Sequence, residues 1–334
     1  MKKLVYKFIL LVLINIVIFT GIAQANAAAE EVFTFNVSLA GATAGGGGNW
    51  DMFGAGLAEA IMKSNKGSVV TVTPGGSTSD VIMLSTGKAE LGLSYNNTVS
   101  DALKGNAPFD QKYENIRGVC SLYNSKFHFV VHKDGRIKSI SSIKENKIPI
   151  TICIGDPGSG GELASIRLLK AYGISLEDIE SWGGKVYHIE QFSGPEMFAD
   201  GTVEAFVVIS FAPQASILEL ANNRDLQILP VDDEIVQSMI NDYDYVADII
   251  PQSAYGFLSG DVKVFSTSAV LITSSDVPEE VIYNVTKGLV ENIDYIRNIH
   301  INLRGLTSEG MAKGLGTLLH PGAEKYYKEI GAIR

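Results

Sequence analysis

The segment Gly155-Asp156-Pro157-Gly158-Ser159-Gly160-Gly161 joins an apolar, β-rich run, Ile148 to Ile154, directly to a helix-patterned run, Glu162 to Tyr172. Glycines let a chain approach a ligand closely, and the first turn of a helix presents unpaired N–H groups at the positive end of its dipole. The junction therefore predicts a site for a carboxylate or phosphate at Gly158, Ser159, Gly160 and Gly161. It lacks the ending of a phosphate-binding P-loop and the spacing of a dinucleotide fingerprint, so a helix cap without a ligand is the alternative.

Residues 1–27 have the features of an export signal. Three lysines precede an apolar core at Phe8 to Phe19, and small residues favour cleavage near Ala25 or Ala27. The alternative is an uncleaved membrane anchor, but the apolar run is near the lower length limit for a span. We therefore expect an exported, soluble mature chain.

Composition narrows the function classes further. Removing the three lysines of the signal takes the formal charge from −10 to −13, and an acidic chain without basic runs argues against nucleic acid as a partner. A mature chain of about 300 residues usually divides into two domains. Cys120 and Cys153 are too few for a disulfide scaffold, and both a single bridge and buried thiols remain open. His128 and His132 share a strand face, but no metal-ligand set completes them, and we expect no metal or cofactor.

Three strand-to-helix turns precede residue 100. Val32 to Leu39, Val69 to Thr73 and Ala89 to Tyr95 have strand patterns, and each is followed by small polar residues and a helix pattern. In an open α/β sheet such turns collect at the carboxyl ends of the strands, where ligands bind. The candidate ligand-binding residues in these turns are Gly48, Asn49, Trp50, Ser77, Thr78 and Asn97.

The same alternation restarts after a long strand at Ile116 to His132. Val203 to Ile209 is a strand that leads into Pro213, and a later loop contains Tyr255; both residues are further ligand-binding candidates. Tyr255 is predicted to form a wall of the cleft, and a packing role under the loop is the alternative. One long helix at Pro278 to Asn298 and shorter ones at about Ser308 to Leu315 and Gly322 to Ile330 are predicted to end the chain.

Fixed cations are absent from the candidate loops. Arg167 falls within the helix after the glycine loop and is expected to face solvent or the domain surface, and Lys126 is the nearest cation in sequence. The predicted anion is therefore held mainly by backbone amides and hydroxyls.

Several motifs in order resemble the TAXI-type solute receptors of TRAP transporters. The glycine loop Gly45 to Trp50, the turn Gly75-Gly76-Ser77, the central loop at Gly155 to Gly160, and His320-Pro321-Gly322 with Tyr326-Tyr327 carry the resemblance over nearly the whole mature chain. The chain departs from that family at Trp50 and Asp51, where paired tyrosines are usual, at Gly161 in place of threonine, at Asp80 in place of asparagine, and at Asn97 in place of aspartate. Trp50 either stacks on a ligand or wedges the loop.

This resemblance implies an α/β, two-lobe, hinged periplasmic-binding-protein-like fold of type II, with mixed sheets flanked by helices. Residues 28–121 with 266–334 are expected to form lobe 1 and residues 122–265 lobe 2. The implied function is a periplasmic, monomeric receptor that captures a small anionic solute, such as glutamate or a dicarboxylate, and delivers it to a TRAP-type permease.

Alternatives to transport stay open at this point. An exported ligand sensor or a surface antigen would share the fold, and an exported enzyme is a further class. No His-Glu-x-x-His or Gly-x-Ser-x-Gly motif supports catalysis. Which solute binds and whether a cation assists are not determined by these residues.

Overall fold

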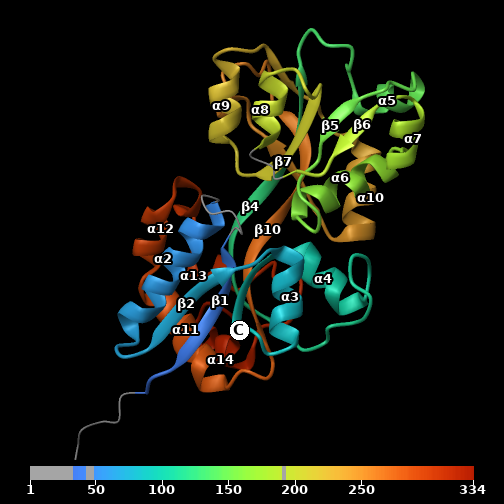
Figure 1. The fold of residues 1–334 in the computed structure, drawn as a ribbon. Helices are drawn as coiled ribbons and strands as arrows, with labels where there is room; N and C mark the ends of the chain where they lie inside the picture. Colours follow the sequence, from blue (N-terminus) through green and yellow to red (C-terminus); the bar gives the residue numbers. More distant parts are fainter. Residues whose placement is uncertain (1–32, 43–48, 190–192) are drawn as a thin grey trace, which may run out of the picture. The chain divides into compact units, whose positions relative to one another are not determined.

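The computed structural model describes residues 33–42, 49–189 and 193–334, without the side chains at positions 42 and 49. The predicted export signal at 1–27 lies outside these residues. In the described ranges, no helix has the length and apolar character needed to cross a membrane. Residues Phe35–Arg334 form one unit built on a 10-stranded sheet, shown in Figure 1.

The sheet has the strand order β2-β1-β3-β10-β4-β7-β5-β6, with β8 paired to β4 and β9 paired to β10. The strands are β1 (Asn36–Ala42), β2 (Val69–Pro74), β3 (Leu91–Tyr95), β4 (Ile116–His132), β5 (Thr151–Cys153), β6 (Lys185–Tyr187), β7 (Ala205–Ser210), β8 (Leu226–Ile228), β9 (Val246–Ile250) and β10 (Val262–Ser274).

Helices lie on both faces of the sheet (Figure 1). They are α2 (Asn49–Ser64), α3 (Ser77–Ser85), α4 (Asn96–Lys104), α5 (Ile140–Glu145), α6 (Gly160–Ala171), α7 (Leu176–Ser181), α8 (Ser193–Ala199), α9 (Ala215–Ala221), α10 (Asp233–Tyr243), α11 (Glu279–Glu291), α12 (Ile293–Ile299), α13 (Ser308–Met311) and α14 (Pro321–Glu329), with short 3-10 helices at Gln252–Ala254 and Ile301–Leu303.

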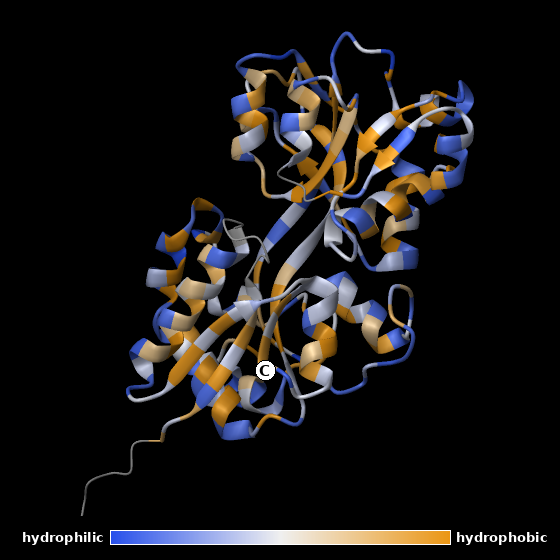
Figure 2. Ribbon diagram, in the orientation of Figure 1, coloured by the Kyte–Doolittle hydropathy of each residue, from blue (hydrophilic) through white to orange (hydrophobic). Residues whose placement is uncertain are grey.

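Two long antiparallel strands, β4 and β10, connect the parts of the sheet. β10 pairs with β3 at one end and with β9 at the other, and β4 changes partner from β10 to β7 at Lys126. Where the two strands lie side by side, polar residues oppose one another, in the pairs Thr267–Ser125 and Ser268–Asn124. Figure 2 shows this stretch as less hydrophobic than the strand ends, which are buried in the core.

The predicted elements agree with the structure where the local pattern was strong. The strand at Ile116–His132 has the predicted bounds, and α3 and α6 begin at the predicted glycine turns. The single long helix predicted at Pro278 to Asn298 is wrong. It divides into α11 and α12 at Asn292, whose side-chain amide instead donates to Ala60 O and to Ser64 Oγ on α2.

Both cysteines are buried as thiols rather than joined in a disulfide. Cys120 lies in β4 and Cys153 in β5, and the Cys153 thiol contacts the carbonyl oxygen of Ile189 at 3.6 Å. Of the two possibilities that the sequence left open, the structure therefore has the buried thiols.

Candidate ligand-binding cavity

A cavity of about 390 Å³ lies where the first turns of α2, α3 and α6 meet the middle of β4. Its walls come from six chain segments that are far apart in sequence. The lining residues are Gly41, Trp50, Gly75, Gly76, Ser77, Thr78, Ser79, Ile82, Tyr95, Tyr123, Ser125, Asp156, Pro157, Gly158, Ser159, Gly160, Gly161, Ile209 and Ser210.

The turn between β2 and α3 is held by a buried carboxylate. Asp80 Oδ1 accepts a hydrogen bond from Gly76 N at 2.8 Å, and a Cβ at Gly75 would lie 2.1 Å from the same oxygen, so only glycine allows this approach. The amides of Ser77, Thr78 and Ser79 follow in the first turn of α3, where they have no intrahelical acceptor. This turn therefore points hydrogen-bond donors into the cavity.

The central glycine loop both caps α6 and lines the cavity. Ser159 Oγ accepts from Glu162 N at 3.1 Å, which leaves the hydroxyl proton available to a ligand. Glu162 Oε2 accepts from Gly158 N at 2.7 Å, and Glu162 Oε1 lies 2.5 Å from His188 Nδ1. The Glu162 carboxylate thus already accepts the hydrogen bond of the Gly158 amide. The Gly160 and Gly161 amides remain as ligand donors at the helix start.

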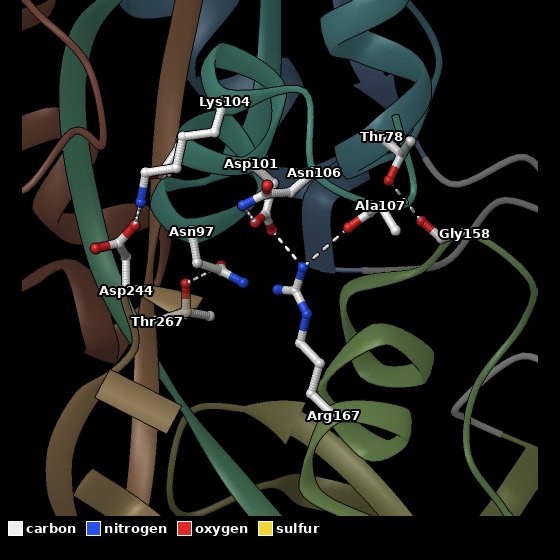
Figure 3. Close-up of polar contacts among 11 residues, drawn as sticks. Thr78, Asn97, Asp101, Lys104, Asn106, Ala107, Gly158, Arg167, Asp244 and Thr267 are labelled. Carbon is white, nitrogen blue, oxygen red and sulfur yellow. Dashed lines mark hydrogen bonds and ion pairs between the residues drawn. The ribbon is translucent and has the colours of Figure 1, made fainter. Parts of the chain in front are cut away.

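The two donor loops lie against each other. Thr78 Oγ1 donates to Gly158 O at 3.2 Å, a contact drawn in Figure 3. A Cβ added at Gly160 would lie 2.5 Å from Cε2 of Tyr95, so the loop approaches this ring as closely as only glycine permits. The donors of α3 and α6 therefore face one shared space beside an aromatic ring.

The aromatic wall consists of Trp50, Tyr95 and Tyr123. Trp50 Nε1 donates to Tyr123 Oη at 3.0 Å, and the Trp50 and Tyr95 ring centroids are 5.2 Å apart. Burial raises the pKa of Tyr95 to about 12 and that of Tyr123 well above its usual value, so both phenols stay neutral. Trp50 is thus fixed by neighbours and still lines the cavity.

Asp156 is the one charged residue among the described lining residues. The cation nearest in sequence, Lys126, pairs with Asp248. Below the α3 turn, burial raises the pKa of Asp80 to about 7. The described lining thus offers a ligand neutral amides and hydroxyls and no fixed cation.

The structure brings most of the sequence-predicted residues together. Trp50, Ser77, Thr78, Gly158, Ser159, Gly160 and Gly161 all line the cavity. Gly48 lies outside the described residues, and of Asn49 only the backbone, at the start of α2, is described.

Three candidates do not line this cavity. Asn97 is buried because α4 begins directly after β3, and its Oδ1 accepts from Thr267 Oγ1 at 2.6 Å. Pro213 is exposed at the end of the β7 loop. Tyr255 was expected to form a cleft wall, but it is 1% exposed, accepts from Gln214 N at 2.8 Å and lies 3.0 Å from His128 Nε2. The predicted wall position of Tyr255 is therefore wrong, because its hydroxyl satisfies buried partners in the core.

The expected exposure of Arg167 is also wrong. Its guanidinium is buried between helices, 2.5 Å from Asp101 Oδ2 and 3.1 Å from Ala107 O, and lies 4.4 Å from the Tyr243 ring centroid. Figure 3 shows Arg167 reaching from α6 to Asp101 and Ala107, beside the exposed pair of Lys104 and Asp244. Sequence reasoning missed this pair because neither partner has a local signal.

Sequence reasoning also missed Tyr95, Tyr123, Ser125 and Ser210. Tyr95 is the last residue of β3 and Ser210 the last of β7, so their place at carboxyl ends of strands was a usable signal. Tyr123 and Ser125 lie in the interior of β4, where only the tertiary arrangement places them in the cavity.

A family model described as the NMT1-like family matches residues 42–331. The chain belongs to the NMT1-like family. This NMT1-like chain is similar to the periplasmic binding protein BugD, with 13% identity, 89% of this chain and 98% of that chain covered, and a TM-score of 0.53. It is similar to PhnD1 from Prochlorococcus marinus in complex with methylphosphonate, with 12% identity, 89% and 99% coverage, and a TM-score of 0.53.

A third solved structure, MatC from Rhodopseudomonas palustris with bound malate, matches with 12% identity, 89% and 94% coverage, and a TM-score of 0.52. At such identities the likeness concerns the fold. The NMT1-like chain therefore has the mixed α/β fold of periplasmic binding proteins, as its sequence predicted.

Proposed function

We propose that this NMT1-like chain is a periplasmic solute receptor that captures a small organic anion and delivers it to a TRAP-type membrane permease. The TAXI-type motifs support the permease class, and an amino acid such as glutamate or a dicarboxylate is the ligand that they imply. The observation that carries the proposal is the convergence of the α3 and α6 first turns on one cavity lined by neutral donors.

The ligands of two relatives support an anion. MatC was solved with malate and PhnD1 with methylphosphonate, and both share this fold. In this chain the donors of Ser77, Ser159 and Gly160 occupy the same cavity, and helix starts favour negative charge.

Closure of two lobes is the proposed mechanism, with lobe 1 at 28–121 and 266–334 and lobe 2 at 122–265. The paired stretch of β4 and β10 around Ser125 and Thr267 is proposed as the hinge, since both strands continue through it from one lobe to the other. The Thr78–Gly158 and Asp101–Arg167 contacts cross the proposed boundary. Small-angle scattering with and without a saturating ligand should give a smaller radius of gyration when the ligand is bound; an unchanged radius would count against closure.

We propose binding rather than catalysis, since no histidine lies in the described cavity lining to act as a base for Ser159. A ligand sensor would use the same cavity. Purification with a membrane permease partner supports delivery, whereas ligand binding without any permease partner supports sensing.

Calorimetric titration tests the ligand class. The panel contains amino acids, dicarboxylates, simple monocarboxylates and neutral sugars. At least one carboxylate is expected to bind with a 1:1 stoichiometry. Tight binding of a neutral sugar, together with failure of every carboxylate, would overturn the proposed anion site.

A further inference from the structure

We infer that the cavity selects a monocarboxylate bearing an aromatic or similarly flat apolar group, in preference to a small dicarboxylate. The inference rests on the proposed function, because it assigns the carboxylate to the helix-start donors. It goes further by assigning the aromatic wall of Trp50, Tyr95 and Tyr123 to the apolar part of the ligand.

The first argument is the apolar surface beside the donors. Trp50 is held by its bond to Tyr123 and by its contact with Tyr95, and Ile82, which is 40% exposed, and Ile209 extend the same lining. Aromatic rings stack on such a wall in offset or tilted arrangements, and burying the exposed apolar surface favours binding. A ligand with a flat apolar group covers surface that a small polar ligand leaves exposed to water.

The second argument is the closeness of the two walls. Gly160 N belongs to the first turn of α6, and a Cβ at this residue would lie 2.5 Å from the Tyr95 ring. A carboxylate bound at these amides therefore has the aromatic wall directly beside it. One molecule with a carboxylate a few bonds from a ring meets both walls at once.

The third argument is the lack of an unpaired cation in the described lining. Its charged residue is Asp156, and the cations Arg167 and Lys126 are already paired with Asp101 and Asp248. The gaps at 43–48 and 190–192 contain no lysine, arginine or histidine in the sequence. A second carboxylate that lies away from the α3 and α6 donors would face Asp156 or the negative faces of the rings, and both repel it.

The fourth argument is size. At roughly 30 Å³ for each water, a cavity of about 390 Å³ holds about 13 water molecules. An aryl-substituted carboxylate displaces more of this water than a small dicarboxylate does. The volume and the apolar wall therefore favour the same ligand class.

Titration of the unmodified protein tests the inference directly. The probes are 3-phenylpropanoate, phenylalanine, succinate, glutamate and 3-phenylpropan-1-ol. The aromatic carboxylates are expected to bind at least about tenfold tighter than succinate and glutamate, and the alcohol much more weakly. The difference between phenylalanine and 3-phenylpropanoate reports whether Asp156 receives an ammonium group.

The outcomes separate the inference from the proposed function. Tighter binding of succinate or glutamate than of the aromatic carboxylates overturns the inference and leaves the anion receptor standing. Failure of every carboxylate while the alcohol binds overturns both. A preference for the aromatic carboxylates supports both.

Tryptophan fluorescence provides a second readout, since the chain has two tryptophans, Trp50 and Trp182, and Trp182 does not line the cavity. In the Trp182→Phe variant the emission of Trp50 should change on binding of 3-phenylpropanoate, with affinity unchanged. Trp50→Ala should weaken that ligand at least about tenfold, and Trp50→Phe, which keeps a ring, roughly threefold. Stacking on Trp50 would be contradicted if the unmodified protein, Trp50→Ala and Trp50→Phe bound 3-phenylpropanoate with equal affinity and the Trp50 emission of the Trp182→Phe variant did not change.

Discussion

The first and second turns of α6 differ in charge. At its start the helix faces the cavity with neutral amides and the Ser159 hydroxyl, whereas Arg167, less than two turns later, forms a buried ion pair with Asp101 on α4. We call Asp101, Lys104, Arg167 and Asp244 the clasp, since these four residues pair α4 with α6 and with the end of α10. Cations near the cavity are thus neutralised by the chain itself, and the cavity keeps its donors for a ligand.

The clasp also contains an internal contrast. The Arg167 and Asp101 side chains are 5% and 3% exposed, whereas those of Lys104 and Asp244 are 52% and 45% exposed. Removing one partner of a buried pair leaves an uncompensated charge, but exposed pairs are screened by water and salt. Replacing one residue of the buried pair is therefore expected to lower the free energy of unfolding much more than replacing one residue of the exposed pair.

The largest expected effect is on the buried pair. Asp101→Ala should lower the free energy of unfolding of the closed form by about 3–5 kcal/mol, because Arg167 remains buried there without its partner. The matched control Lys104→Ala should change it by about 0–1 kcal/mol. Urea denaturation measures both.

A double variant sharpens this prediction. Asp101→Leu combined with Arg167→Met removes both charges and should be more stable than either single variant. Equal losses from Asp101→Ala and Lys104→Ala would show that the buried pair is not special.

Asp80 gives the next effect, because among the described residues no cation pairs with this buried carboxylate as Arg167 pairs with Asp101. Burial raises its pKa to about 7, so between the unfolded value near 4 and about 7 the folded state binds the extra proton. Stability should therefore fall as pH rises through this window, by up to about 1.4 kcal/mol per pH unit. Asp80→Asn retains an oxygen to accept from Gly76 N and should flatten this part of the stability profile. An unchanged slope in the variant would assign the pH dependence to other groups.

Tyr255 tests the division between cavity and core. Tyr255→Phe leaves Gln214 N and His128 Nε2 without their buried partner and should lower stability by about 1–3 kcal/mol. Ligand affinity should stay within about twofold of the unmodified protein, since Tyr255 does not line the cavity. A large loss of affinity with normal thermal stability would restore the cleft-wall role that the sequence suggested.

The smallest expected effect is at Ser159, which serves both the helix and the cavity. Ser159→Ala should lower stability by about 0.5–2 kcal/mol through loss of the cap to Glu162 N and weaken carboxylate binding by roughly three- to tenfold. Ser175→Ala is the matched control, since Ser175 Oγ caps α7 by accepting from Asp178 N at 3.0 Å. The control should lose stability alone; the same loss of affinity in both variants would show that Ser159 acts only as a cap.

Local pattern was enough to predict the elements that carry the site. Glycine and small polar residues between a strand pattern and a helix pattern mark where α3 and α6 begin. At α6 the Ser159 cap and the positive φ angles of Gly155 and Gly158 act within a few residues of the helix start. The convergence of these loops on one cavity followed from the family resemblance and from the rule for the carboxyl ends of strands.

The sequence by itself determined the α/β alternation, the glycine loops that cap helices and line the cavity, and the neutral character of the donors. The tertiary structure alone decided that Tyr123 and Ser125 line the cavity, that Tyr255 and Asn97 are buried away from it, and that Arg167 pairs with Asp101. The physical reason is the distance along the sequence over which each kind of interaction acts. Caps and turns depend on neighbours along the chain, whereas the direction of a strand side chain and the partner of a buried charge depend on segments that only folding brings together.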